Sequence, residues 1–137
     1  MLGAVTTFPV LAPSVSPAGD SPRLEYDPQF ARAGEATIEF QIAPWLAFQS
    51  GDAIGFAWSL DGGPPEVVRP HTFQSTRVWE QAAAESVCRL SVKAPVTAGH
   101  HVLKYWYVTP GVVLERIVDT GGLRPGTLGP PESRRLP

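Results

Sequence analysis

The chain has 137 residues, which is about the length of one domain. Its 13 glycines and 15 prolines exclude a helical bundle or coiled coil and favour short strands joined by turns. The formal charge of -2 gives no basic field for nucleic acid or an anionic membrane, and no apolar run is long enough to cross a bilayer. We therefore expect neither a nucleic-acid partner nor a membrane partner.

The N-terminal 22 residues show no hydrophobic periodicity. Residues 12–22 read APSVSPAGDSP, a composition typical of a linker or surface loop. We expect residues 1–22 to form an extended segment and residues 23–137 to form the folded domain. The first charged residue is Asp20, so the N-terminus lacks the basic region of a secretory signal peptide, and the sequence assigns no compartment.

Two strands are predicted in the first half of the chain. Residues 36–43 alternate apolar and polar side chains, which predicts a half-buried strand that ends at Pro44. Residues 54–60 alternate large apolar with small side chains and predict a second strand. Asp61-Gly62-Gly63 supplies positive-φ positions for a tight turn, so residues 66–69 are expected to return as a hairpin partner.

The second half predicts one helix and three strands. Residues 76–86 lack glycine and proline and space their apolar residues as a short helix does. Residues 88–93 alternate as a third strand with Cys88, the only cysteine, facing inward. Residues 101–109 carry large side chains on both faces, as a central strand covered on both sides does, and residues 112–118 form a last strand. The expected fold is all-β, an antiparallel β-sandwich of jelly-roll or immunoglobulin-like type with at most one short helix.

The last third of the chain carries its most specific residues. The run over residues 100–133, HHVLKYWYVTPGVVLERIVDTGGLRPGTLGPPES, resembles the closing segment of glycoside hydrolase family 115, the xylan α-1,2-glucuronidases. The shorter groups PRLEYD, AGEA, SLD and WE, which begin at residues 22, 33, 59 and 79, fit the same family. The resemblance covers nearly the whole chain, although Thr109 stands where the family usually has an acidic residue.

This resemblance implies a non-catalytic C-terminal β-sandwich domain without the family domain's first strand or two. The family's catalytic carboxylates belong to a barrel upstream, and a (β/α)₈ barrel needs about 250 residues. We therefore expect no enzyme activity from this chain alone. The expected partners are other domains or subunits of the parent glycosidase, and an edge strand left unpaired could also pair with a second copy of the chain.

Catalytic and metal-binding arrangements find little support in the residue spacing. Glu25 with Asp27, and Glu115 with Asp119, are the carboxylate pairs that glycoside hydrolysis would need, but Asp119 precedes a glycine corner and is expected to accept hydrogen bonds in a turn. The adjacent histidines 100 and 101 face opposite sides of a strand and cannot grip one ion. We predict no catalytic residue, no metal site and no cofactor.

Sugar binding is the remaining chemistry, because carbohydrate rings stack on aromatic planes. Trp58 and Trp106 lie within apolar alternation and are expected in the core. Trp45 follows Pro44 in a predicted loop and is the candidate platform, with Tyr107 as the second carbohydrate-binding residue. The first hypothesis is a non-catalytic accessory domain that supports interdomain or subunit packing. The alternatives are a carbohydrate-binding module for glucuronoxylan and, more remotely, a stand-alone immunoglobulin-like interaction domain.

Overall fold

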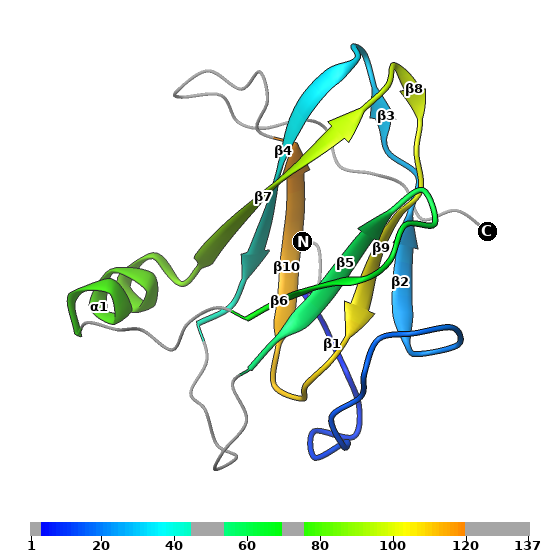
Figure 1. Ribbon diagram of the computed structural model, residues 1–137. Helices are drawn as coiled ribbons and strands as arrows, with labels where there is room; N and C mark the ends of the chain where they lie inside the picture. The colour runs from blue at the N-terminus through cyan, green and yellow to red at the C-terminus, as the bar shows by residue number, and fades with distance from the viewer. Residues whose placement is uncertain (1–3, 45–53, 70–75, 120–137) are drawn as a thin grey trace.

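The computed structural model describes residues 4–44, 54–69 and 76–119, which form two four-stranded antiparallel sheets (Figure 1). The first sheet contains, in spatial order, β1 (Val5–Thr6), β10 (Val113–Asp119), β4 (Gly34–Ile42) and β7 (Cys88–Val96). The second contains, in spatial order, β2 (Arg23–Tyr26), β9 (Leu103–Tyr107), β5 (Phe56–Leu60) and β6 (Glu66–Val68). The predicted antiparallel β-sandwich is confirmed.

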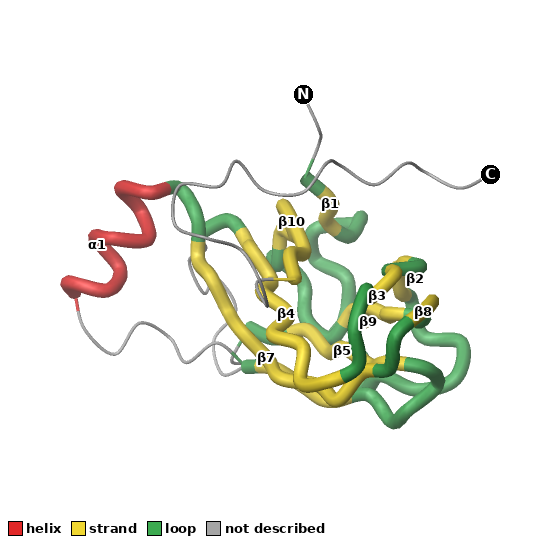
Figure 2. The backbone as a smooth tube through the Cα atoms, turned by 90° about the horizontal axis from the view of Figure 1, so that it is seen from above, coloured by secondary structure: helices red, strands yellow, loops and turns green. Residues whose placement is uncertain are grey.

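A two-stranded ribbon links the sheets at one end. It pairs β3 (Gln29–Phe30) with β8 (Gly99–His100). Along the chain, β3 lies between β2 and β4, and β8 lies between β7 and β9. The chain therefore passes through one strand of the ribbon each time it crosses between the sheets at these two places. The helix α1 (Thr76–Glu85) stands to one side of the sheets, away from β2 and β9 (Figure 2). Within the described ranges, no helix is long and apolar enough to span a bilayer.

The core between the sheets is aromatic, and the alternation of β4 explains it. Ile38, Phe40 and Ile42 are at most 2% exposed, because every second side chain of this strand faces the opposite sheet. The ring of Phe40 lies 5.0 Å from that of Phe56, measured between centroids, and Phe56 stacks at 5.0 Å on Tyr105. Three strands from two sheets thus meet at one aromatic cluster.

Strands β5 and β9 are buried on both faces, as the sequence predicts for residues 101–109, which contain β9. On one face Trp58 and Tyr105 join the core between the sheets. On the other face Ala57 and Trp106 pack with Val108 in a second cluster. The prediction that Trp58 and Trp106 are core residues is confirmed.

A tight turn joins β5 to β6, at the position predicted. Asp61 and Gly62 both have positive φ, at 50° and 76°, and the Gly63 amide donates to the Leu60 carbonyl at 2.9 Å. Two consecutive positive-φ residues define the hairpin turn whose twist matches the strands on either side. The turn reverses the chain, and β5 then pairs with β6 in the register that places Phe56 opposite Val68.

Candidate functional site

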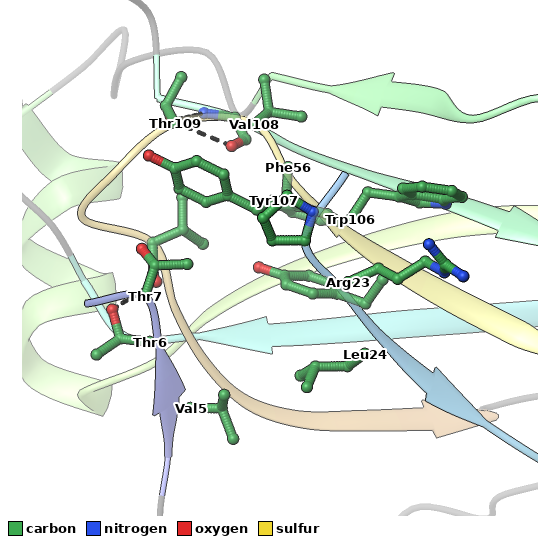
Figure 3. Close-up of a pocket in the computed structure, with 14 residues that line it drawn as sticks. Val5, Thr6, Thr7, Arg23, Leu24, Phe56, Trp106, Tyr107, Val108 and Thr109 are labelled. Atoms are coloured by element: carbon green, nitrogen blue, oxygen red, sulfur yellow. Dashed lines mark hydrogen bonds between the residues drawn. The ribbon is translucent and has the colours of Figure 1, made fainter. Parts of the chain in front are cut away.

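A cavity of about 150 Å³ opens between the β1–β10 edge of one sheet and the β2–β9 edge of the other (Figure 3). The strands contribute large apolar side chains to its wall, with Val5 from β1, Leu24 from β2 and Tyr107 from β9. Arg23 and Thr7 supply polar side chains. The strand β1, which borders the cavity on one side, is only two residues long.

Two threonine hydroxyl groups at the cavity bond to the chain's own backbone. Thr6 Oγ1 donates to the Val112 carbonyl at 3.1 Å, and Thr109 Oγ1 donates to the Gly55 carbonyl at 3.1 Å while accepting the Gly55 amide at 2.8 Å. Thr109 thus joins two segments of the domain through its hydroxyl. These two hydroxyls already bond within the domain, and most of the other side chains that line the cavity are apolar.

Tyr107, one of the two residues proposed to bind carbohydrate, lines this cavity with 8% of its surface exposed. Its Oη lies 3.1 Å from the Ala12 carbonyl oxygen and 3.0 Å from that of Pro13, so the two carbonyls share its single O–H, and burial raises its pKa. The ring therefore fixes the N-terminal segment against β9. Trp45, the other candidate, lies outside the described residues, and the carbohydrate-binding role of both stays a prediction.

A charged cluster lies beside the cavity on the outer face of β2 and β9. The Arg23 guanidinium sits 5.0 Å from the centre of the Trp106 ring, and the Lys104 ammonium sits 5.9 Å from it. Glu25 accepts a hydrogen bond from Arg23 Nε at 2.7 Å and lies 3.7 Å from Lys104. The bond to Arg23, with the charge of Lys104 adding to it, lowers the pKa of Glu25.

The carboxylates that the spacing pairs, Glu25 and Asp27, have separate partners. Glu25 belongs to the charged cluster, whereas Asp27 lies 3.4 Å from the exposed ring of His100. A general acid needs a pKa raised toward neutrality, and the pKa of Glu25 shifts the other way. Among the described residues, no group of three metal-binding side chains comes together.

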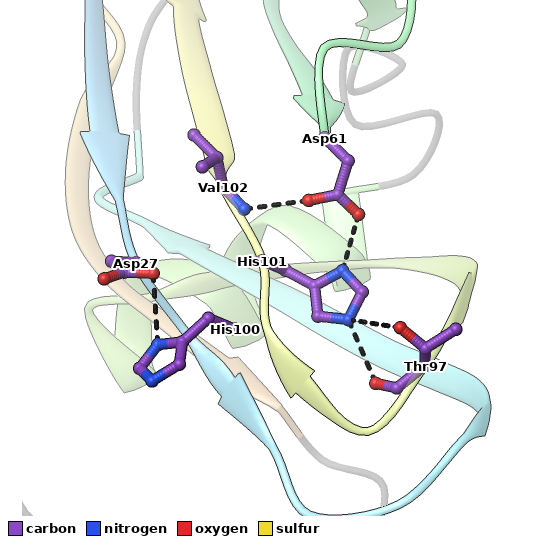
Figure 4. A network of polar contacts seen from close by, with 6 residues as sticks. All are labelled: Asp27, Asp61, Thr97, His100, His101 and Val102. Atoms are coloured by element: carbon purple, nitrogen blue, oxygen red, sulfur yellow. Dashed lines mark hydrogen bonds and ion pairs between the residues drawn. The ribbon is translucent and has the colours of Figure 1, made fainter.

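A polar network centres on His101, which is 6% exposed (Figure 4). Its Nδ1 lies 2.5 Å from Asp61 Oδ2, and its Nε2 lies 3.0 Å from the Thr97 carbonyl and 3.3 Å from Thr97 Oγ1. The order Thr, His, Asp follows that of a nucleophilic triad, but the Thr97 carbonyl is the nearer partner of Nε2. The ring is therefore engaged by the backbone and does not serve as a base for Thr97.

The sequence reading missed this network. It placed Asp61 in a turn and His101 at the start of a strand, 40 positions apart, with no motif to join them. The one available signal is the placement of aspartate at a turn position with positive φ, where its carboxylate can reach nearby amides.

Comparison with known families gives the placement of the chain. Residues 1–132 match the glycosyl hydrolase family 115 C-terminal domain. The chain belongs to this family. The resemblance read from residues 100–133 is thereby confirmed, and no curated protein matches the chain.

Solved structures place the family 115 C-terminal domain among similar folds. A family 115 4-O-methyl-α-glucuronidase with specificity for decorated arabinogalactans is similar over 69% of this chain, at 23% identity and a TM-score of 0.61. The match covers 12% of that protein's length. A family 35 carbohydrate-binding module from Clostridium thermocellum matches 70% of this chain and 67% of its own, at 21% identity and a TM-score of 0.49. An exo-β-1,3-galactanase from Phanerochaete chrysosporium matches 69% of this chain and 20% of its own, at 16% identity and a TM-score of 0.47.

Proposed function

We propose that the chain is a non-catalytic accessory domain of a xylan α-glucuronidase and that it supports packing against other domains or subunits of that enzyme. Membership of the family 115 C-terminal domain supports this proposal. A similar solved protein, itself a glucuronidase, is many times longer than the matched segment, which fits a domain that works within a larger enzyme.

The observation that carries the proposal is an exposed apolar turn, formed by residues Phe8 to Leu11. Phe8 is 92% exposed, Val10 57% and Leu11 73%. The turn closes through a hydrogen bond from the Ala12 amide to the Pro9 carbonyl at 3.0 Å. Three large apolar side chains in four positions are costly to leave in water, and such clusters mark contact surfaces.

The apolar turn is held firmly on both sides. Before it, Thr6 pairs with Val113 in the first sheet. After it, Tyr107 Oη binds the Ala12 and Pro13 carbonyls, and the Val15 amide donates to the Val108 carbonyl at 2.8 Å. A contact segment fixed in advance loses little conformational entropy when it binds, which favours packing against a partner.

The test measures association of this chain with the separately produced catalytic region of its parent glucuronidase. We expect saturable binding by biolayer interferometry, and a loss of at least about tenfold in affinity for the double variant Phe8→Ser/Leu11→Ser. Val67→Ser is the matched control, because Val67 is also apolar and exposed but lies on β6. Unchanged binding in the double variant would contradict a packing role for this surface.

A second measurement tests the absence of catalysis. The purified chain is incubated with 4-O-methylglucuronosyl xylo-oligosaccharides, and released uronic acid is quantified. We expect no release above the buffer blank, because Glu25 and Asp27 are engaged by separate basic partners. Release that follows the concentration of the chain would overturn the assignment as an accessory domain.

Carbohydrate binding is the second candidate function, and the position of Tyr107 favours it. Tyr107 and Tyr105 line the cavity with 8% of each residue exposed, so a sugar ring would reach them only by entering the cavity. Isothermal titration with glucuronoxylan oligosaccharides tests this, beside Trp45→Ala and Tyr107→Phe variants. Saturable heat that the variants lose would support a carbohydrate-binding module, whereas no heat at millimolar ligand would leave the packing role alone.

A further inference from the structure

Three turns of the sandwich converge on His101. Its backbone amide donates to the Pro28 carbonyl at 3.0 Å, in the turn between β2 and β3. Its Nδ1 meets Asp61 in the turn between β5 and β6, and its Nε2 meets Thr97 in the turn between β7 and β8 (Figure 4). One residue thus joins three turns that lie far apart in the sequence.

Both ring nitrogens of His101 face oxygen atoms that accept hydrogen bonds. The Asp61 carboxylate and the Thr97 carbonyl have no hydrogen to give, so each needs an N–H from the ring. A neutral imidazole carries one N–H, so it can serve only one of these two acceptors, and its other nitrogen would accept a hydrogen bond from the Thr97 hydroxyl, 3.3 Å from Nε2. The doubly protonated, positively charged ring is therefore the form that satisfies the carboxylate and the carbonyl together.

Among the groups around the His101 ring, Asp61 supplies the negative charge that balances the protonated ring. The edge of Phe30 from β3 meets the ring at 5.3 Å between centroids, and Thr97 contributes no charge. Asp27 and His100, the titratable residues on the neighbouring turn and on β8, pair with each other at 3.4 Å. The hydrogen bond that the His101 ring donates to Asp61 is the main cause that raises the pKa of His101, and the bond to the Thr97 carbonyl adds to it.

Asp61 carries the effect of the proton into the backbone. Its Oδ1 accepts the Val102 amide at 2.9 Å, and its own amide donates to the Val102 carbonyl at 2.9 Å. The carboxylate thus bridges the charged ring and the start of β9. The hydrogen bonds that Asp61 accepts from the Val102 amide and from the His101 ring lower the pKa of Asp61, and the bond from the Val102 amide is the larger cause.

We propose that His101 is a proton-dependent latch: its charged ring binds the turns of Asp61 and Thr97 at once at the β3–β8 end of the sandwich, and its neutral ring, with a single N–H, gives up one of these two hydrogen bonds and loosens that end. The latch rests on the network alone and does not depend on the proposed accessory role. A proton would then control whether this end of the domain is closed.

The direction of the pH effect follows from the two pKa shifts. His101 has a raised pKa in the folded chain, so its contribution is complete below the ordinary value of 6.5 and is lost as the pH rises through the folded pKa. Asp61 has a lowered pKa, so its contribution is present above 3.8 and is lost as the pH falls through the folded value. The latch is therefore closed in mildly acidic solution and opens toward alkaline pH.

Hydrogen exchange followed by NMR on the intact chain tests the latch. Between pH 6 and pH 9, after correction for the intrinsic exchange rate, protection of the Val102 amide is expected to fall by about tenfold or more, because the neutral His101 ring no longer holds the Asp61 carboxylate, the acceptor of that amide, through a hydrogen bond between two charged groups. Amides of the β4–β7 ladder, such as Ile38, provide the internal reference. The imidazole resonances of His101 should titrate above 6.5.

Two variants separate the latch from a general effect of pH. Asp61→Asn keeps the size of the side chain but removes the countercharge, so the pH dependence of Val102 protection should disappear. His100→Gln is the matched control and should keep the wild-type dependence, because His100 is exposed and bonds elsewhere. Equal Val102 protection at both pH values in the wild-type chain would overturn the proposal. So would a loss of the pH dependence of Val102 protection that is equally large in both variants.

Discussion

The indole Nε1 of Trp106 donates a hydrogen bond to Ser59 Oγ at 2.9 Å, between neighbouring strands of the second sheet. Both residues are buried, Trp106 at 5% and Ser59 at 3% exposed. Among the described residues the other core indole, that of Trp58, has its Nε1 buried without a partner. Ser59 thus allows a large amphipathic side chain to be buried without leaving its donor unpaired.

Replacing Ser59 with alanine should destabilise the chain by about 1–3 kcal/mol, because the buried indole N–H of Trp106 loses its acceptor. Urea unfolding followed by tryptophan fluorescence measures the change. Ser91→Ala, on the exposed face of β7, is the control and should stay within about 0.5 kcal/mol of the wild type. Equal stability of the two variants would contradict the importance of the bond.

Removal of the Phe40 ring should have the largest effect. Phe40 is 0% exposed and touches the rings of Phe56 and Tyr105, so Phe40→Ala is expected to cost about 3–5 kcal/mol. Thermal and urea unfolding measure this loss. The control is Val67→Ala, which changes an exposed apolar side chain and should have little effect on stability. A small loss of stability in Phe40→Ala would mean that the two sheets do not pack against this ring.

Gly62 should resist substitution for a backbone reason. Its φ is 76°, and a Cβ there would meet nothing within 4 Å, so strain of the backbone is the whole cost. We expect Gly62→Ala to lower stability by about 1–2 kcal/mol. Gly62→Asn should cost less, because asparagine tolerates this conformation, and thermal unfolding of both variants would show the order.

Cys88 should react slowly with thiol reagents. Burial raises the pKa of its thiol, an effect that the nearby Arg89 only partly opposes, and the thiolate is the reactive form. Labelling at pH 7.5 should be slower than for the same chain in concentrated urea. The variant Cys88→Ala/Ser91→Cys moves the thiol to the exposed face of β7 and should react faster, and equal rates would contradict the burial of Cys88.

The elements with a strong local pattern could be predicted from the sequence. The alternation in β4 predicts its buried face, and the large side chains on both faces of β9 predict a central strand. The turn at Asp61 and Gly62 follows from residues that tolerate positive φ. Each of these features is encoded in neighbouring residues, so no knowledge of the tertiary structure is needed.

Features that depend on distant residues could not be predicted. Strand β1 lies within the segment expected to be extended, and it is held by backbone pairing with β10, which leaves no pattern of side chains. The contact between His101 and Asp61 joins two turns that only the complete sandwich brings together. The cavity beside Tyr107 likewise arises from the meeting of two sheet edges.

The position of the last two strands constrains the order in which the molecule can fold. β9 lies between β2 and β5, and β10 lies between β1 and β4, so one of the two interior strands of each sheet comes from the second half of the chain. The earlier strands β1 and β2 have their pairing partners only near positions 114 and 105. Long-range pairing of this kind slows folding. A nascent chain that ends before Leu103 should therefore stay unfolded on the ribosome, and the domain should close only when the final strands emerge.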